Sequence, residues 1–207
     1  MQYNLTDFYL FENCNDKLIV EISNHLLIRN AISGETIFNQ GDEPKNLYIV
    51  LEGSLYVTEF TDDGKAVAHE LITKGDCFGE IAILDQKSRS ASILCAENVK
   101  LGVLSSDFMQ NVLLKDINVC KNLLLKFSSI IRKMNTQVFN LVTASAKKRL
   151  LFHISYLSEN RIDQPGKKIL DKLLSHADLA ALSGMTRETV SRVMSDLRNE
   201  GFISNNS

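Results

Sequence analysis

The sequence predicts an α+β protein with three parts in order: an antiparallel β-barrel, one long helix and a small helix-turn-helix domain. Three observations support this fold class. Between residues 26 and 105, short apolar runs alternate with glycine-centred turns, as in an antiparallel barrel or sandwich. Residues 106–141 contain neither proline nor glycine, as expected of a continuous helix. A helix, a glycine turn and a second helix follow within residues 175–198.

Composition limits the classes of protein to consider. The chain has 207 residues, 44% of them hydrophobic and 23% charged, as in ordinary globular proteins. It has no secretory signal pattern and no apolar run of membrane-spanning length, so we expect a soluble, cytoplasmic protein without a membrane partner. The four cysteines form no C-x-x-C pair and the four histidines are scattered. We therefore expect reduced thiols, no metal site and no prosthetic group.

Charge is distributed unevenly along the chain. The formal net charge is −2, yet residues 142–207 carry ten Lys/Arg against seven Asp/Glu. A mildly basic C-terminal part on an acidic body permits a nucleic-acid-binding face without proving one.

The N-terminal part predicts short helical pieces and then strands. Residues 5–25 place five apolar residues on one helical face: Leu10, Phe11, Leu18, Ile19 and Ile22. The strands that follow are short, and Asp63-Gly64 is a hairpin signal because this pair tolerates the positive φ of a tight turn. We expect strands at residues 28–32, 36–38, 47–51, 55–60, 67–72, 92–94 and 99–104.

The stretch Phe78–Ala91 carries the groups that a nucleotide needs. Gly79 is followed at once by Glu80, and Arg89 comes nine residues later among small residues. Small residues let backbone N–H groups approach a ligand, an arginine fork suits a phosphate, and a carboxylate accepts hydrogen bonds from sugar hydroxyls. The alternative is a barrel hairpin with an ordinary surface arginine.

This stretch resembles the phosphate-binding cassette of cyclic-nucleotide-binding domains, and the glycine spacing from Gly34 to Gly53 resembles their early strands. The fold implied is a β jelly-roll barrel around one small ligand, a cyclic nucleotide with cAMP first. Ser88 departs from the proline that many members have. By position, Glu80 takes the ribose 2′-hydroxyl, Arg89 pairs with the phosphate, and backbone groups complete the cradle at Gly79, Ile81, Ser90 and Ala91.

Residues 113–141 predict a dimerisation helix. Eight residues follow a 3-4 spacing that is sustained for three and a half heptads, and a second row (Leu113, Leu123, Ile130) lies to one side. We expect the second row to pack on the barrel and the heptad seam to meet a second copy in a parallel homodimer. The alternative is that the seam packs within its own chain. The seam consists of Ile117, Cys120, Leu124, Phe127, Ile131, Met134, Val138 and Leu141.

Residues 142–207 predict a small DNA-binding domain. We expect a helix at 147–157, a turn at 163–166, a short strand at 168–174, and two helices separated by Gly184. Ser175 to Asp178 resembles a capping box for the first helix, and Thr186 caps the second. Six residues of this second helix are the candidates for base and phosphate contacts: Thr186, Arg187, Glu188, Thr189, Ser191 and Arg192.

The string Met185–Arg192 resembles the recognition helix of the Crp/Fnr regulator family. The resemblance implies a palindromic duplex with TGTGA- or TTGA-like half-sites, RNA polymerase as a partner, and a wing that begins at Gly201-Phe202-Ile203. In family members that bind cAMP, a Thr-Ser pair on the long helix contacts the adenine. Those positions fall here on Met134 and Asn135, so the expected adenine signature is absent.

We therefore expect a homodimeric regulator with a sensing barrel (1–112), a dimerisation helix (113–141) and a winged helix-turn-helix (142–207). Two alternatives remain open. One is the same fold with a different effector or none, and the other is a regulatory module that binds cyclic nucleotides but not DNA. An enzyme is not expected, because no nucleophile–base pair or metal set has workable spacing.

Overall fold

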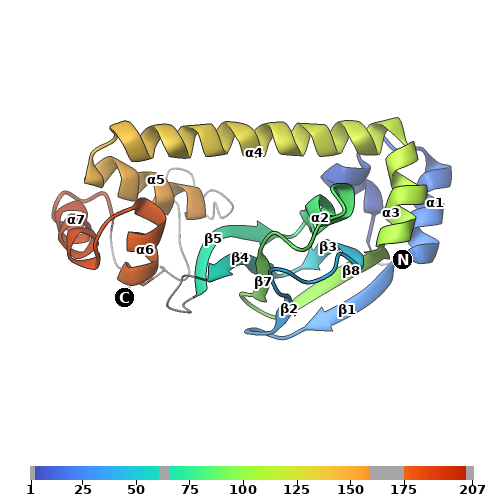
Figure 1. The fold of residues 1–207 in the computed structure, drawn as a ribbon, viewed down its shortest axis with the longest axis horizontal. Coiled ribbons are helices and arrows are strands. Elements are labelled where there is room, and N and C mark those ends of the chain that lie inside the picture. The colour runs from blue at the N-terminus through green and yellow to red at the C-terminus, as the bar shows by residue number, and fades with distance from the viewer. Residues whose placement is uncertain (1–2, 61–65, 159–174, 204–207) are drawn as a thin grey trace. The chain divides into compact units, whose positions relative to one another are not determined.

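The computed structural model describes residues 3–60, 66–158 and 175–203 (Figure 1). The chain forms two compact units, Met1–Ile130 and Ile131–Ser207, and each is described by itself. Three expectations lie outside the described residues: the Asp63-Gly64 hairpin turn, the turn and strand expected between residues 163 and 174, and the end of the wing.

Short helices open the first unit: η1 (Leu5–Asp7), η2 (Tyr9–Phe11) and α1 (Asp16–His25). The Asn15 side chain accepts a hydrogen bond from the backbone N–H of Leu18 at 2.9 Å, which satisfies a free donor at the start of α1. The apolar face predicted for this segment is confirmed, because Leu10, Phe11, Leu18 and Ile22 are buried and Ile19 is partly buried.

In the described part of the first unit, eight strands form two antiparallel four-stranded sheets, with orders β1-β8-β3-β6 and β2-β7-β4-β5. This pairing of sequentially distant strands in two sheets is the jelly-roll arrangement, so the predicted fold class is confirmed. A core of apolar side chains from both sheets lies between them, Val50, Leu55 and Leu101 among its members. The strands are β1 (Leu27–Ala31), β2 (Thr36–Phe38), β3 (Asn46–Glu52), β4 (Ser54–Phe60), β5 (Ala66–Thr73), β6 (Cys77–Phe78), β7 (Ser92–Cys95) and β8 (Val99–Ser105).

Strand β3 is buried on both faces. Tyr48 and Val50 point into the core between the sheets, whereas Leu47, Ile49 and Leu51 pack against the helices of the first unit. A strand covered on both faces reads as a continuous apolar run, which explains why the sequence from Leu47 to Leu51 does not alternate.

The cassette contains two elements that the sequence did not predict, the short strand β6 and helix α2 (Glu80–Leu84). Gly79 adopts a left-handed φ of 85° immediately before α2, a conformation open to glycine at little cost. This turn redirects the chain from β6 into the helix, so Glu80 becomes its first residue.

The long helix begins later than expected. The segment 106–116 forms α3 (Ser106–Asn111) and the 3-10 turn η3 (Leu113–Lys115), and the long helix α4 runs from Ile117 to Thr143. Asp116 is the reason, because its carboxylate accepts hydrogen bonds from the backbone N–H groups of Asn118 and Val119 at 2.8 and 3.3 Å and so caps a new helix start. The expected start at residue 113 is therefore wrong.

The second unit is helical where it is described. It contains α5 (Ala146–Ser158), α6 (His176–Ser183) and α7 (Arg187–Asn199). The predicted helices and the cap at Thr186 are confirmed, since the Thr186 side chain accepts from the Thr189 N–H. One core joins the three helices, with Leu150, Ile154, Leu179, Val190, Met194 and Leu197 at its centre.

Candidate effector and DNA-binding sites

Arg89 is the cationic centre of the cassette, and it is only 4% exposed. Its Nη1 donates to the carbonyl oxygen of Gly79 and its Nη2 to that of Asn46, both at 2.6 Å. The guanidinium also lies over the Phe38 ring, 4.2 Å from the centroid, in cation–π geometry. Burial lowers the pKa of Arg89 below its ordinary value, because the charged form is poorly solvated there.

One nitrogen of this arginine has no hydrogen-bond partner in the part of the chain that the structure describes. Arg89 Nε is buried and has no hydrogen-bond partner among the described residues. A buried N–H without an acceptor costs free energy. An anionic oxygen placed against Nε would remove that cost. The Arg89 guanidinium therefore fits the phosphate of a cyclic nucleotide.

Gly79 is required by its surroundings as well as by its φ. A Cβ at this position would lie 2.6 Å from Arg89 Nη1 and 3.2 Å from the Asn46 carbonyl oxygen. The absence of a side chain therefore lets the Arg89 guanidinium reach the backbone at the start of α2.

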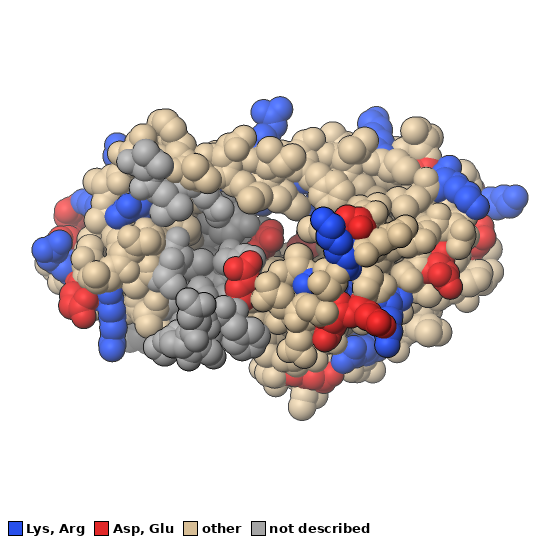
Figure 2. Space-filling model, in the orientation of Figure 1, with Lys and Arg blue, Asp and Glu red and all other residues tan. Residues whose placement is uncertain are grey.

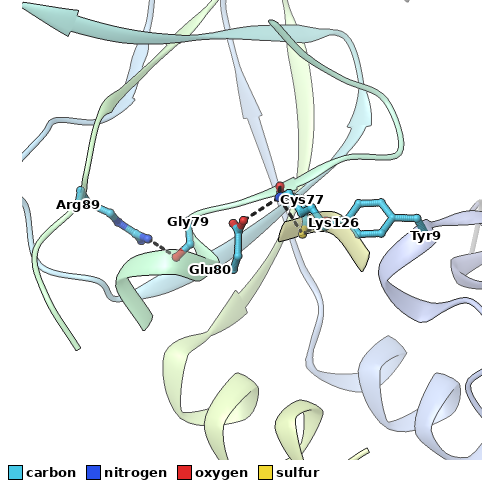
Figure 3. Close-up of polar contacts among 6 residues, drawn as sticks. All are labelled: Tyr9, Cys77, Gly79, Glu80, Arg89 and Lys126. Atoms are coloured by element: carbon cyan, nitrogen blue, oxygen red, sulfur yellow. Dashed lines mark hydrogen bonds and ion pairs between the residues drawn. The ribbon is translucent and has the colours of Figure 1, made fainter. Parts of the chain in front are cut away.

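Glu80 points away from Arg89 toward the long helix (Figure 3). Its Oε1 accepts from Lys126 Nζ at 2.7 Å, and the Glu80 residue is only 3% exposed. Lys126 Nζ also donates to the Cys77 carbonyl oxygen at 2.6 Å. The carboxylate expected to accept a ribose hydroxyl thus already has a cationic partner from α4.

The ion pair extends into a buried polar chain through Cys77 and Tyr9. The Tyr9 hydroxyl and Cys77 Sγ are 2.6 Å apart, and Lys126 Nζ lies 3.7 Å from the same sulfur. Burial raises the pKa of Cys77 to about 12, despite the opposing effect of Lys126. Cys77 is therefore a neutral thiol at neutral pH, and all four cysteines are free as predicted.

The remaining cassette residues differ in accessibility. Ile81 is 44% exposed and Ser90 is exposed, whereas Ala91 is buried just before β7. Met134 and Asn135 belong to the second unit and are exposed on α4. Their predicted contact with the base of an effector remains a prediction.

Most described residues of the α4 seam are exposed within one chain, whereas Phe127 packs against the core of the first unit and Cys120 is partly buried. Five of the seam's apolar residues are more than half exposed, whereas Val119 and Leu123 on another face are buried. Figure 2 shows that much of the visible surface along α4 carries no charge. An apolar row of this length on the surface indicates an interaction surface; the exposed seam residues are Ile117, Leu124, Ile131, Met134 and Val138.

Helix α7 presents the predicted DNA-contacting residues to solvent. Arg187, Glu188, Ser191 and Arg192 are exposed, whereas Val190 on the opposite face is fully buried. This is the placement that base and phosphate contacts require.

Two further contacts orient this face. Thr186 and Thr189 hydrogen-bond to each other at the helix start, and the Ser191 hydroxyl lies 2.8 Å from His176 Nδ1. Hydrogen bonds from its own backbone amide and from Thr186 hold the pKa of Glu188 below its usual value, so Glu188 is an ionised acceptor. Side chains of both charge signs are visible over the helix-turn-helix (Figure 2).

Sequence reasoning missed Lys126, Asn46 and Phe38 as parts of the site. Lys126 had a detectable signal, because it lies three residues after Leu123 and four before Ile130, in the row that packs on the barrel. A lysine in such a row is rarely buried without a partner. The partners of Arg89 had no local signal, since Phe38 and Asn46 are distant in sequence.

Two family profiles match the chain: the cyclic nucleotide-binding domain over residues 28–116 and the Crp-like helix-turn-helix domain over residues 148–207. Among curated relatives, the cyclic AMP receptor protein of Thermus thermophilus is 29% identical over 170 residues, which cover 82% of this chain and 76% of the relative. These matches define a DNA-binding transcription regulator with a cyclic nucleotide-binding domain.

Solved structures agree. A CRP/FNR-family regulator from T. thermophilus is 26% identical, with a TM-score of 0.69 over 87% of this chain and 90% of that one. The regulator CLP of Xanthomonas campestris shares the fold at 20% identity, with a TM-score of 0.74 over 93% and 96% of the two chains. The chain belongs to the Crp/Fnr family of transcription regulators. No helix in the described part of the chain has the length and apolar character needed to cross a membrane.

Proposed function

We propose that the protein is a homodimeric transcription regulator whose barrel binds a cyclic nucleotide, with cAMP as the first candidate. The observation that carries the effector assignment is the buried Arg89 Nε without a partner, beside a left-handed Gly79. The name of the T. thermophilus relative, cyclic AMP receptor protein, supports the same choice.

The homodimer is proposed through α4. The exposed seam residues repeat with coiled-coil spacing, and burying them against a second copy would remove their apolar surface from water. A two-fold dimer also presents two α7 helices, as a palindromic DNA site requires.

On DNA, Arg187 and Arg192 are proposed to grip guanines and Glu188 to accept from cytosine. Thr186, Thr189 and Ser191 are proposed to contact phosphates and neighbouring bases. The half-sites would be TGTGA- or TTGA-like, and RNA polymerase is the proposed protein partner. The sensing, dimerising and DNA-binding roles are proposed for residues 1–112, 113–141 and 142–207, with the dimerising helix itself beginning at Ile117.

A second candidate keeps the DNA-binding function with a different effector or none. The Lys126–Glu80 pair supports it, because it occupies the carboxylate that a ribose hydroxyl would use. Met134 supports it as well, since it replaces the expected adenine contact.

Calorimetric titration with cAMP, and with cGMP in parallel, tests the effector assignment. We expect roughly micromolar binding of one nucleotide, lost in Arg89→Leu. Lys87→Leu is the matched control, because Lys87 is an exposed cation two residues away in the same loop. Absence of heat with both nucleotides would favour the second candidate.

Analytical ultracentrifugation tests the dimer. Leu124→Glu places a charge in the seam and should shift the protein toward monomer, whereas Ser129→Glu places one at an exposed position off the seam and should leave the dimer intact. A monomeric parent protein at micromolar concentration would contradict the proposal.

A further inference from the structure

The ion pair between Glu80 and Lys126 joins the effector cassette to the long helix. Glu80 is the first residue of α2, and Lys126 lies in the part of α4 that belongs to the same compact unit. Both side chains are largely buried, at 4% and 20% exposure for Glu80 and Lys126. Each charged group therefore has the other in place of water. Removing one partner would leave the other as an unpaired, buried charge, which costs free energy.

Lys126 is held in place by three groups. Its ammonium donates to Glu80 Oε1 and to the Cys77 carbonyl oxygen, and it lies 5.8 Å from the centroid of the Tyr9 ring. Burial by itself would favour the neutral amine, but the Glu80 carboxylate and the polar groups of Cys77 stabilise the ammonium, and the pKa of Lys126 is raised. Lys126 is therefore a cation throughout the physiological pH range.

An effector that uses Glu80 has to share or take this carboxylate. On the Arg89 side of the cassette, the unpartnered Nε can donate a hydrogen bond to an anion. The Glu80 side already has its cation, supplied by the chain itself. The two halves of the cassette thus differ. Arg89 has a nitrogen without a partner among the described residues, whereas Glu80 is already paired with Lys126 at the place where a ligand hydroxyl would bind.

We propose that Lys126 is an internal competitor of the effector at Glu80, so that binding exchanges the α2–α4 ion pair for a hydrogen bond from an effector hydroxyl. This inference rests on the proposed function, because it takes a cyclic nucleotide as the ligand. It makes Lys126 a residue that sets effector affinity. It also gives the ligand a direct effect on α4, because the helix loses its ion pair with Glu80 when the ligand binds, while its contact with the Cys77 carbonyl can remain. Thermodynamic linkage makes the effect reciprocal. Effector binding shifts the equilibrium toward the broken α2–α4 ion pair, and breaking that pair by other means raises the affinity for the effector by the same factor.

Calorimetric titration of the full-length protein with cAMP tests the competition. Lys126→Met should bind cAMP roughly tenfold or more tightly than the parent protein, because the hydroxyl no longer displaces an ammonium. Lys126→Arg should stay close to the parent, since it restores a cation. Lys121→Met is the matched control, because Lys121 is exposed on the same helix, and its affinity should not change.

A double-mutant cycle keeps the test sharp if one variant is unstable. In a Glu80→Gln background, Lys126→Met should no longer raise cAMP affinity, because competition needs both partners. Lys126→Gln serves as a second neutral variant, and thermal unfolding of each variant establishes that it is folded.

The outcomes separate this inference from the proposed function. If the parent binds cAMP and Lys126→Met binds it equally or more weakly, the competition is overturned and the cyclic-nucleotide assignment stands. If neither parent nor Lys126→Met binds cAMP or cGMP, the effector assignment fails together with the competition. Binding that appears only in Lys126→Met would support the inference most strongly.

Discussion

The cassette and the recognition helix use the same residue types in opposite ways. In the cassette, Glu80 and Arg89 are buried and bonded to groups of their own chain. On α7, Glu188 and Arg192 are exposed. The side chains proposed to contact DNA are thus exposed, whereas an effector that uses Glu80 would exchange its ion pair with Lys126 for a contact of its own. A site that is already engaged couples binding to a rearrangement of the protein, while an exposed one does not.

The largest expected effect is on operator binding. Arg192→Ala removes a side chain proposed to contact guanine and should cost about 1–3 kcal/mol per half-site. Fluorescence anisotropy with a palindromic duplex at constant salt measures the loss. Arg198→Ala, near the C-terminal end of the same helix, should change the affinity far less. Equal losses for the two variants would mean that α7 contributes only general positive charge.

The next effect contrasts the two arginines in protein stability. Arg89→Leu leaves the Gly79 and Asn46 carbonyls without their donors and should lower the unfolding free energy by about 1–3 kcal/mol. Arg192→Ala, on the surface, should stay within about 0.5 kcal/mol. Urea denaturation of both variants measures the difference. Similar stabilities would show that the Arg89 contacts contribute little net free energy.

A smaller effect contrasts two glycines with positive φ. Gly79 and Gly201 have φ values of 85° and 76°, but a Cβ meets Arg89 only at Gly79, and at Gly201 it meets nothing within 4 Å. Both alanine variants carry backbone strain. Gly79→Ala should be less stable than Gly201→Ala by about 1 kcal/mol, because the guanidinium loses a hydrogen bond. Thermal unfolding measures the two shifts, and equal shifts would contradict the close fit at Gly79.

The smallest expected effect is a pH dependence of stability that comes from His153 in the second unit and not from Lys126 in the first. Burial lowers the pKa of His153 in the helical core of the second unit. The unfolded chain then binds a proton more readily than the folded one, so stability should fall as pH drops below the ordinary value of 6.5. Lys126 has a raised pKa and keeps its charge in this range. Urea denaturation between pH 5 and 8, in roughly unit steps, should show the loss, and His153→Gln should remove it.

Local patterns were sufficient for most of the fold. The Leu47–Leu51 run and the glycines around it predicted strands because turn residues and apolar length are local signals. Thr186 predicted a helix start because its hydroxyl bonds within its own turn. Helix α2 was missed because five residues show no helical period. The break before α4 was missed because Asp116 looks like any polar helix residue until its capping contacts are known.

The sequence predicted which residues form the cassette site, but not the contacts that these residues make with the rest of the chain. Gly79, Glu80 and Arg89 were named from their spacing. In the structure they meet at the start of α2, where Arg89 donates to the Gly79 carbonyl oxygen. That Arg89 folds onto Asn46, and that Glu80 pairs with Lys126, depends on contacts between residues more than forty positions apart. Spacing along the chain carries no information about such contacts.

Strand β3 has a consequence for how the effector site moves. It pairs with β8 and β6, has no solvent-facing side between Leu47 and Leu51, and begins at Asn46, which holds Arg89. Amide hydrogens in such a central strand exchange only when the whole domain opens. The Asn46 carbonyl that holds Arg89 therefore lies at the start of the strand that we expect to exchange most slowly. Ligand-induced change in hydrogen exchange is therefore expected in α2 and α4, with β3 as the unmoving reference.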